Sequence, residues 1–392
     1  MDRVSFYKAD VTELEKNLLE NVIESKLLTV GPFVYRFEEA ILKFLNAPYF
    51  LATSSGTSAL HIAIKVMGWG EDDEVIISPM VHIGVPNILL IENVGMKMVD
   101  IDPENLSLDP NKVREVIKRD YVNSEEGLKN KETGRLLKGI VIYHLYGIPA
   151  SMEEFLEIKE EFNLKVIEAC WESFGSKYII NGNSLMTGVA SDVGVFSFTR
   201  YGQINVGEGG GLVFKTEDEY KKADMLRYHG IPKEYIEYQT IMGGFNYNLD
   251  ELSSAVGVGQ MIRINEMLGK RNAVYEMYEK GLSDIGELKL INGRKDTETA
   301  WYSVVVQLDR KIDRSKLIQI LMNRGIPTKV FYPVIFRLNL YDNLIRNTHL
   351  EELNIADSVA SSVLSLPFYG DLTESEVVYV SSVLKDALRN SI

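Results

Sequence analysis

The sequence contains a single cysteine, Cys170, among its 392 residues. One thiol cannot close an internal disulfide, and it cannot build a zinc or iron–sulfur site that needs several cysteines. We therefore predict no metal site, and so little cysteine is typical of a cytoplasmic protein. The sequence also lacks an apolar run near the ~20 residues of a membrane span, and its first residues show no apolar signal core. We expect no membrane partner.

Clusters of positive charge are also scarce. The chain has 42 Lys and Arg against 56 Asp and Glu, a formal net charge of −14, and no basic block is longer than a pair. Nucleic acid and anionic membranes attract clustered Lys and Arg, so neither is expected as a partner. With 45% hydrophobic and 25% charged residues, the composition is that of a globular protein, and the length predicts roughly two or three domains.

Seven short apolar runs recur before residue 215. They are rich in Val, Ile and Phe without strict alternation, which is typical of strands buried on both faces. Helix-like segments separate several of them, at Ser58–Met67, Asp109–Arg119 and Ser151–Glu161. This alternation predicts an α/β domain with a mostly parallel seven-stranded sheet. The predicted strands are Tyr49–Ser55, Glu74–Pro79, Met96–Asp102, Leu137–Tyr146, Leu164–Cys170, Val193–Phe198 and Gly209–Phe214.

The pattern changes at about residue 250. We predict a large α/β domain over residues 1–249, with an N-terminal segment, and a smaller C-terminal α+β domain over residues 250–392. The polar segment Asn123–Arg135 is predicted to be a solvated surface insertion. The elements predicted for the smaller domain are the helices Leu249–Gly281, Arg314–Arg324 and Glu374–Leu388 and the strands Trp301–Leu308 and Ile326–Phe331.

One predicted strand runs into a helix at Thr53–Leu60, through small hydroxyl residues and Gly56. The free N–H groups and positive dipole of a helix start favour an anion, and glycine lets a phosphate approach closely. A simple N-cap by Ser or Thr gives the same pattern without a ligand, so this segment alone leaves both interpretations open. A second glycine cluster, Gly207–Gly211, is typical of a turn as much as of a ligand loop.

Further motifs follow one another along the chain: Gly31-Pro32, Phe37-Glu38, Ser54–His61, Val99–Asp102, His144–Gly147, Phe196–Phe198, Gly207–Gly210, Leu226–Gly230, Asn246-Tyr247, Leu249–Leu252, Tyr332-Pro333 and Leu366-Pro367. In this order and spacing they resemble the DegT/DnrJ/EryC1/StrS sugar aminotransferase family over nearly the whole chain. The resemblance implies fold type I of the transferases that depend on pyridoxal phosphate (PLP), with helices on both faces of the sheet. It also implies a homodimer with the active site between subunits, and a keto sugar attached to a nucleotide as the substrate.

The resemblance implies a phosphate cradle at four positions of this sequence. They are Gly56 and Thr57 in the strand-to-helix turn, Ser197 after the sixth strand, and Asn246, which in relatives reaches across from the partner subunit. Taken alone, Ser197 or Asn246 also fits a polar residue whose hydrogen bonds are satisfied within a turn or strand. Their register with Gly56-Thr57 in the family pattern favours retained phosphate contacts. We therefore expect a small-molecule partner, a nucleotide sugar or another phosphorylated metabolite.

The resemblance breaks down around the cofactor ring. The family's catalytic lysine stands five residues before the glycine that opens the Gly-Glu-Gly-Gly segment, and that position is Gly202. The aspartate that pairs with the pyridinium nitrogen is replaced by Ala169, and the stacking aromatic residue falls at or near Ile83. Transamination with PLP needs the lysine for the internal aldimine and for proton transfer. No cofactor is firmly implied, and PLP or pyridoxamine phosphate (PMP) is expected only as a non-covalent ligand.

The candidate acid–base residues near the lost ring are Glu172, His82 and Tyr201, with Glu208 beside them. A carboxyl group buried at residue 172 would have a raised pKa, which suits acid–base chemistry. Each of these residues also fits a solvated, capping or hydrogen-bonded structural role, and that alternative stays open.

Three functions remain compatible with the sequence. The first is a diverged, lysine-less protein of nucleotide-sugar or secondary-metabolite biosynthesis that binds a phosphate-bearing ligand without an internal aldimine. The second is a non-catalytic or regulatory partner of an active paralogue in a heterodimer. The third is a PLP-dependent aminotransferase that uses another lysine, such as Lys177 or Lys329. The reach of a lysine side chain, about 6 Å, argues against this third function, because the reacting groups need a fixed geometry.

Overall fold

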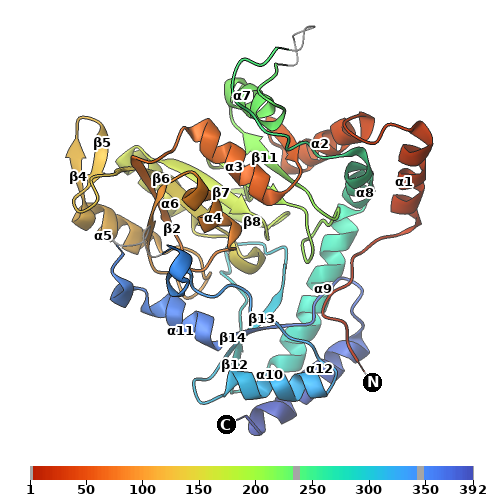
Figure 1. Ribbon diagram of the computed structural model, residues 1–392. Helices are drawn as coiled ribbons and strands as arrows, with labels where there is room; N and C mark the ends of the chain where they lie inside the picture. The colour runs from red at the N-terminus through yellow and green to blue at the C-terminus, as the bar shows by residue number, and fades with distance from the viewer. Residues whose placement is uncertain (1–2, 233–238, 342–347, 392) are drawn as a thin grey trace.

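The computed structural model describes residues 3–232, 239–341 and 348–391. Its central feature is a mixed sheet whose main path runs β1-β11-β10-β7-β6-β2-β3 (Figure 1). Neighbouring strands from β10 to β3 are parallel, whereas β11 is antiparallel to both β1 and β10. The predicted α/β class with a mostly parallel sheet is confirmed. The strands on this path are β1 (Tyr49–Thr53), β2 (Asp73–Ile77), β3 (Gly95–Met98), β6 (Leu136–Tyr143), β7 (Lys165–Cys170), β10 (Val193–Ser197) and β11 (Gly210–Phe214).

A hairpin extends this sheet from seven to nine strands. Its strands β4 (Tyr121–Ser124) and β5 (Gly127–Asn130) pair with each other, and β5 also pairs with β6. The prediction of a solvated insertion at Asn123–Arg135 is therefore only partly right. Most of the hairpin is exposed, but Asn130 is buried and donates a hydrogen bond to Glu74 Oε1 at 2.6 Å. This buried contact fixes the hairpin to the sheet.

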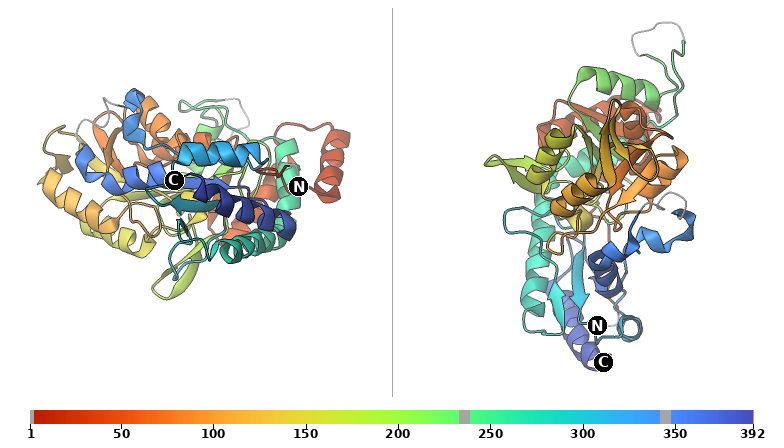
Figure 2. Two further views of the ribbon diagram at one scale, coloured as in Figure 1. Left: turned by 90° about the horizontal axis from the view of Figure 1, so that it is seen from below. Right: turned by 90° about the vertical axis from the view of Figure 1, so that its left-hand side faces the viewer.

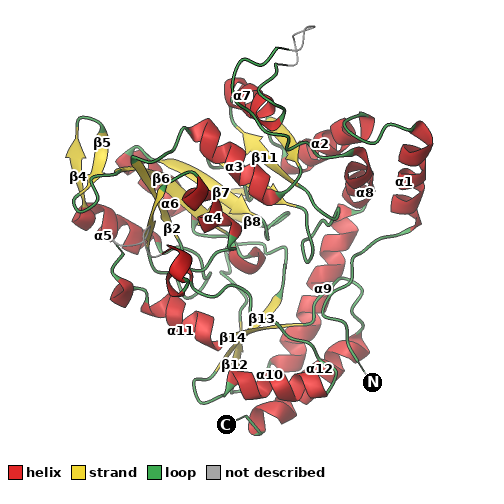
Figure 3. Cartoon of the chain, viewed as in Figure 1, coloured by secondary structure: helices red, strands yellow, loops and turns green. Residues whose placement is uncertain are grey.

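Buried side chains alternate along the strands between two apolar layers. In β2, Val75 and Ile77 belong to one layer and Ile76 to the other, because successive side chains of a strand point to opposite faces. Helices therefore cover both faces of the sheet, as the resemblance implied (Figures 1 and 3). The first layer holds α3 (Gly56–Met67), α4 (Gly84–Ile91) and α7 (Glu217–Arg227), and the second holds α2 (Pro32–Leu45), α5 (Pro110–Asp120), α6 (Met152–Phe162) and α8 (Glu251–Ile262).

A second, antiparallel sheet has the order β12-β13-β14. Figures 1 and 2 place it with α10 and α12 at the end of the molecule opposite α7. The helix α9 runs from beside α8 toward α10 and α12. The helix α1 packs on α8. The remaining elements are α1 (Glu13–Ser25), β8 (Lys177–Ile180), β9 (Asn183–Met186), α9 (Ile264–Leu282), β12 (Leu288–Leu290), β13 (Val304–Leu308), α10 (Arg314–Asn323), α11 (Asn354–Ser362), β14 (Val363–Leu366) and α12 (Glu374–Arg389).

Two predicted elements differ from the structure. The predicted helix Leu249–Gly281 is interrupted at Arg263 (φ −105°, ψ 8°), whose N–H donates to the carbonyl group three residues earlier. The predicted strand Ile326–Phe331 forms only an isolated bridge, between Lys329 and Ser365. An apolar run becomes a strand only when it finds a continuous partner, and this run finds a single residue of β14.

The domain boundary at residues 249 and 250 stays a prediction. The first helix after it, α8, packs against α1 and α2. At the other end of the chain, the N–H of Val4 donates to the carbonyl oxygen of Gly325 at 3.0 Å. The N-terminal segment therefore contacts residues that follow the predicted boundary. Within the described ranges, no helix combines the length and the apolar character that crossing a membrane would need.

Candidate functional site

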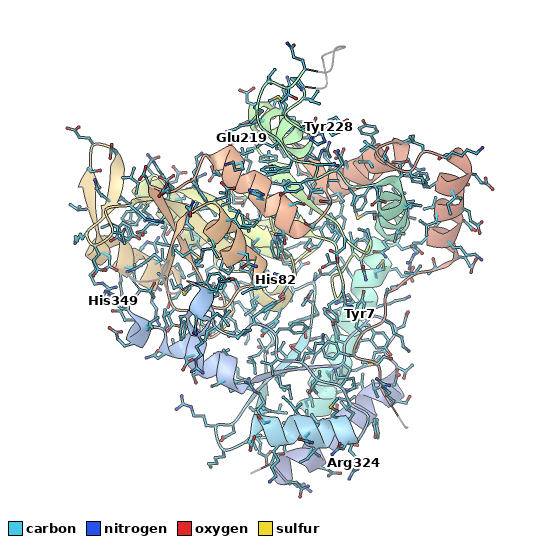
Figure 4. All side chains as sticks on the ribbon, in the orientation of Figure 1. Tyr7, His82, Glu219, Tyr228, Arg324 and His349 are labelled. Carbon is cyan, nitrogen blue, oxygen red and sulfur yellow. The ribbon has the colours of Figure 1, made fainter. Side chains whose placement is uncertain are left out.

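A cavity of about 340 Å³ lies where the parallel strands end. Because β2, β6, β7 and β10 are parallel, their carboxyl ends meet at one edge of the sheet, the usual place for a ligand in such folds. His82 follows β2, Tyr143 ends β6, and Glu172 follows β7. Tyr302 and Tyr332 from the C-terminal part complete the wall. Figure 4 labels His82 in this central region, between the large sheet and the elements around β13.

The helix α3 begins at the wall of this cavity. Ser55 Oγ accepts a hydrogen bond from Ser58 N–H at 3.0 Å, and Ser58 Oγ accepts one from Ser55 N–H at 2.9 Å. Ser55 is therefore an N-cap, as one interpretation of the sequence held. The N–H groups of Gly56 and Thr57 precede any intrahelical carbonyl partner, and both residues line the cavity. Capping and anion binding are thus compatible at this helix start.

Ser197, the last residue of β10, lies directly against Gly56. A Cβ atom at residue 56 would lie 2.6 Å from Ser197 Cβ, so a larger residue would have to displace the strand end. Ser197 Oγ lies 3.4 Å from Thr199 Oγ1, and Arg200 lines the same cavity. Two amide groups, two hydroxyl groups and a guanidinium group therefore surround one space, and this donor set suits a phosphate.

Three of the predicted site residues lie outside this cavity. Asn246 lines a separate cavity of about 590 Å³, together with Leu28 and Tyr228. Ile83 precedes α4 and is 41% exposed, and Ala169 is fully buried within β7. Within one chain, the structure therefore brings Gly56, Thr57 and Ser197 together and leaves these three residues apart from them.

Gly202, the position of the family's lysine, does not line this cavity but a small neighbouring one. A Cβ atom there would lie 2.9 Å from the Ile204 carbonyl oxygen and 3.2 Å from that of Thr199. The preceding residue, Tyr201, has a left-handed backbone (φ 75°) and lines the cavity. No lysine is among the described residues that form the cavity wall.

Two other lysines were candidates for the missing amine. Lys329 lies next to Tyr201, donates to its hydroxyl oxygen, and has its Nζ 4.6 Å from the centre of the ring. Lys177 pairs with Glu298 at 2.7 Å, away from the cavity. Lys329 is thus a neighbour of the site, and its amine is already engaged by a wall residue.

Glu172 is the buried carboxyl group of the cavity, with 1% of its surface exposed. Its Oε1 accepts hydrogen bonds from the hydroxyl groups of Tyr143, at 3.0 Å, and Tyr332. Its Oε2 accepts one from the N–H of Tyr146 at 2.5 Å. Burial outweighs these hydrogen bonds and raises the pKa of Glu172 to about 7. The carboxyl group can therefore hold or release a proton near neutral pH.

His82 is held by a backbone group and two rings. Its Nδ1 accepts a hydrogen bond from Gly84 N–H at 3.0 Å, and its ring lies edge to face against Trp171 and Tyr332, with centroids 5.1 and 5.7 Å away. Burial lowers the pKa of His82, so its ring is neutral at pH 7 with the proton on Nε2. Trp171 Nε1 is buried and has no hydrogen-bond partner within the described part of the chain. Trp171 was not predicted as a site residue, although it stands next to the candidate Glu172.

A second buried group contains His144, Glu168 and Cys170, whose ligand-type atoms lie within 4.8 Å of one another. Both ring nitrogens of His144 are engaged, Nδ1 by Ala150 N–H and Nε2 by Glu168, each at 3.0 Å. Glu168 also accepts a hydrogen bond from Gly188 N–H at 2.8 Å. These atoms already serve structural hydrogen bonds, so their proximity does not indicate a metal site.

Comparison with known proteins agrees with the sequence motifs. The model of the DegT/DnrJ/EryC1/StrS aminotransferase family matches residues 9–385. A GDP-perosamine synthase from Caulobacter vibrioides is 29% identical over 95% of this chain and 94% of its own. The structure of NtdA from Bacillus subtilis with bound cofactor PMP is 26% identical, with a TM-score of 0.85 over 99% of this chain and 86% of that one. The PLP form of Spr1654 from Streptococcus pneumoniae, described as a putative sugar aminotransferase, is 21% identical and shares the fold, with a TM-score of 0.88 over 100% of both chains.

Proposed function

This chain belongs to the DegT/DnrJ/EryC1/StrS aminotransferase family, and we propose that it binds a phosphate-bearing ligand of nucleotide-sugar or secondary-metabolite biosynthesis without a covalent bond between PLP and a lysine. One observation carries the proposal. The phosphate-type donors at Gly56, Thr57 and Ser197 meet at one cavity, whereas Gly202 faces a different one. The donors suited to an anion line this cavity, and no lysine of the described residues does.

The residues fit the phosphate of a PLP-like ligand but not the attachment of its ring. Ala169 is fully buried in β7 and offers no carboxylate to a pyridinium nitrogen. Lys329, which contacts the wall residue Tyr201, already donates to its hydroxyl oxygen and does not line the cavity. A bound PLP or PMP would therefore be a non-covalent ligand, and conventional transamination is not part of the proposal.

Glu172 is the proposed acid–base group of the site. Its pKa of about 7 gives comparable amounts of the protonated and ionised forms at neutral pH, which is the condition that favours proton transfer in both directions. Tyr143 and Tyr332 donate hydrogen bonds to its Oε1 and line the same cavity, so either phenol offers a path for the proton. His82 and Tyr201 line the same cavity and are the further candidates.

A homodimer would complete the phosphate site with Asn246 of a second chain. Asn246 lies at a cavity whose rim carries the exposed side chains of Tyr35 and Tyr228. Exposed apolar surface beside a polar residue suits a closed, two-fold interface. Sedimentation should give about twice the chain mass of 44.3 kDa. A stable monomer would remove Asn246 from the site, and co-purification with a paralogue would support the heterodimer alternative.

The proposed function is tested with PLP itself. The purified chain is incubated with PLP, reduced with borohydride, digested and mapped by mass spectrometry. We expect no stoichiometric reduced adduct on a single lysine, because no lysine among the described residues lines the cavity. Calorimetry with inorganic phosphate should nevertheless show binding. An adduct on Lys329 would overturn the proposal and favour an aminotransferase that uses this lysine.

A further inference from the structure

A second cavity, of about 630 Å³, lies at the edge of the large sheet opposite the candidate site. Asp73 begins β2, Leu137 lies near the start of β6 and Lys165 begins β7, and all three line it. Because these strands are parallel, their starts share one edge, and ligands of such folds usually bind at the other. The volume is nevertheless within the range of small-molecule sites, roughly 300–1,000 Å³.

The β4–β5 hairpin forms one wall of this cavity. Its residues Asn123, Glu126 and Leu128 line the cavity, and Figure 1 shows the hairpin beside β6. The buried hydrogen bond from Asn130 to Glu74, at 2.6 Å, holds the hairpin in place. The polar insertion seen in the sequence therefore encloses a space against the sheet.

Lys138 enters the wall from a β-bulge. In the ladder between β2 and β6, Glu74 pairs with Leu137. The next residue of β2, Val75, pairs with Gly139, so Lys138 is the extra residue of the bulge. Bulges redirect a side chain and are frequent beside functional sites. This bulge gives the cavity an ammonium group.

The Lys138 ammonium group is available to a ligand. Its Nζ lies 3.7 Å from Asp73 Oδ1, beyond hydrogen-bond distance, and it donates no hydrogen bond to the residues that the structure describes. Lys165, in the same wall, shares Asp192 with Lys159, at 3.0 and 3.2 Å. Three ammonium groups therefore share two carboxylates, and this part of the wall carries excess positive charge.

Trp69 adds a second donor to the cavity. It is 4% exposed and lines the wall, and its Nε1 has no acceptor within the described ranges of the chain. A Cβ atom at Gly139 would lie 2.7 Å from Trp69 Cζ2, so the glycine beside the bulge makes room for the indole. A buried indole N–H normally has a hydrogen-bond partner. A ligand in the cavity can supply this acceptor.

The other charges of the wall limit the ligand to a small negative charge. Glu161 is already paired with two cations of α5, each at 3.2 Å, and Glu126 adds a carboxylate on the hairpin. The helices α3 and α6 end at the cavity, at Gly68 and Asn163, and a helix end carries partial negative charge. The wall therefore favours a single negative charge over a dianion such as phosphate.

We propose that this cavity is a second binding site, for a small organic carboxylate. The carboxylate oxygens accept hydrogen bonds from Lys138 and Trp69, and Lys165 adds positive charge. The binding forms and breaks no covalent bond. The cavity is separate from the candidate site, so this inference does not depend on the proposed function. The body of the ligand lies against the apolar wall residues Met67, Leu128, Leu137 and Phe162.

Matched pairs of probes isolate the carboxylate. Glucuronate and glucuronamide form one pair, and 3-phenylpropionate and 3-phenylpropanamide form the other. The chain has three tryptophans, so the ¹H–¹⁵N spectrum of the ¹⁵N-tryptophan-labelled protein contains three indole signals, and Trp69→Phe assigns one of them. We expect the carboxylate of at least one pair to shift the Trp69 signal and to bind about tenfold more tightly than its amide. The Trp171 signal should not move.

Variants test the ammonium groups. Lys138→Gln keeps most of the side chain and removes the charge, so the preference for the carboxylate should disappear. Lys165→Gln should reduce the preference and gives an independent test should the first variant fail to fold. Lys16→Gln is the matched control, because Lys16 pairs with Glu13 on α1 and does not line the cavity. It should retain the tenfold preference.

Other outcomes would overturn the proposal. Equal affinities of carboxylate and amide in both pairs would remove the charge selection. A shift of the Trp171 signal alone would place the carboxylate in the candidate site. Tighter binding of phenyl phosphate than of 3-phenylpropionate at the Trp69 signal would contradict the preference for a single charge. In Lys138→Gln, binding of inorganic phosphate at the start of α3 should be unchanged, so the two sites are tested separately.

Discussion

Tyr332 and Glu172 are 160 residues apart in the chain and share a hydrogen bond inside the cavity. Tyr332 holds a left-handed backbone (φ 58°), which is unfavourable for a residue with a side chain. Strain of this kind persists where the surrounding structure fixes it, and it is concentrated at functional sites. The C-terminal part of the chain therefore supplies a residue that the buried carboxyl group needs.

The pKa of Glu172 predicts how a substitution changes stability with pH. The folded pKa of about 7 lies above the ordinary 4.5, so the folded chain holds a proton that the unfolded chain releases between these values. The contribution of Glu172 is therefore full below pH 4.5 and is lost as the pH rises through 7. Relative to the wild type, Glu172→Gln should gain up to about 3 kcal/mol more unfolding free energy at pH 8 than at pH 4.5. Urea unfolding at both pH values measures this difference. A pH-independent difference would contradict the raised pKa.

Gly56→Ala tests the phosphate cradle. The added Cβ would lie 2.6 Å from Ser197 Cβ, so the helix start and the strand end must separate. We expect at least about tenfold weaker binding of inorganic phosphate and a loss of about 1–3 kcal/mol of stability, as for other overpacked sites. Gly70→Ala is the matched control, because nothing lies within 4 Å of its added Cβ. Unchanged phosphate affinity in Gly56→Ala would move the anion site elsewhere.

Gly202→Lys should not restore covalent binding of PLP. Its Cβ would crowd the carbonyl oxygens of Ile204 and Thr199, and residue 202 lines the neighbouring cavity. Adding Ala169→Asp and Ile83→Trp should not help, because neither residue lines the described site. Borohydride reduction followed by mass spectrometry measures the adduct, and thermal unfolding should show destabilisation by about 1–3 kcal/mol. An adduct on residue 202 in the single variant would show that the loop rearranges easily.

Arg227 holds a buried network beside β1, and its loss should be severe. Its guanidinium pairs with Glu38 at 2.8 Å and Asp224 at 2.5 Å, and it donates to the Ala52 carbonyl oxygen at 2.7 Å. Arg227→Met leaves buried carboxylates without their partner, so we expect a loss of about 3–5 kcal/mol in urea unfolding. Arg114→Met, whose partners are largely exposed, should change stability by less than about 1 kcal/mol. Similar effects of the two substitutions would refute this distinction.

The large sheet could be predicted from the sequence because its signal is local. Runs such as Val75–Ile77 are apolar on both faces, and each coincides with a strand. The second sheet was harder, because β12 spans only Leu288–Leu290 and the apolar run Ile326–Phe331 lacks a continuous partner. Strand pairing depends on residues that are distant in the sequence, so the hydrophobicity of a local run does not predict its partner.

The candidate site was predictable where a motif marks it. Glu172, His82 and Tyr201 were found from their spacing to family motifs, and all three line one cavity. Trp171 and Tyr143 were missed, because an aromatic residue at the end of a buried strand resembles core packing. Tyr143 and Trp171 line the cavity because β6 and β7 end at the same edge of the sheet. That arrangement exists only once the sheet is assembled.

The position of β1 also sets the order of events during synthesis. Its partner in the described sheet, β11, begins about 160 residues later. At about 5–20 residues per second, the ribosome needs roughly 8 to 30 s to make that stretch. The turn at Gly56 needs Ser197, which belongs to the same late stretch. A nascent chain that ends before β10 therefore holds β1 unpaired and exposed to chaperones, and it still lacks the Ser197 contact of the proposed phosphate site.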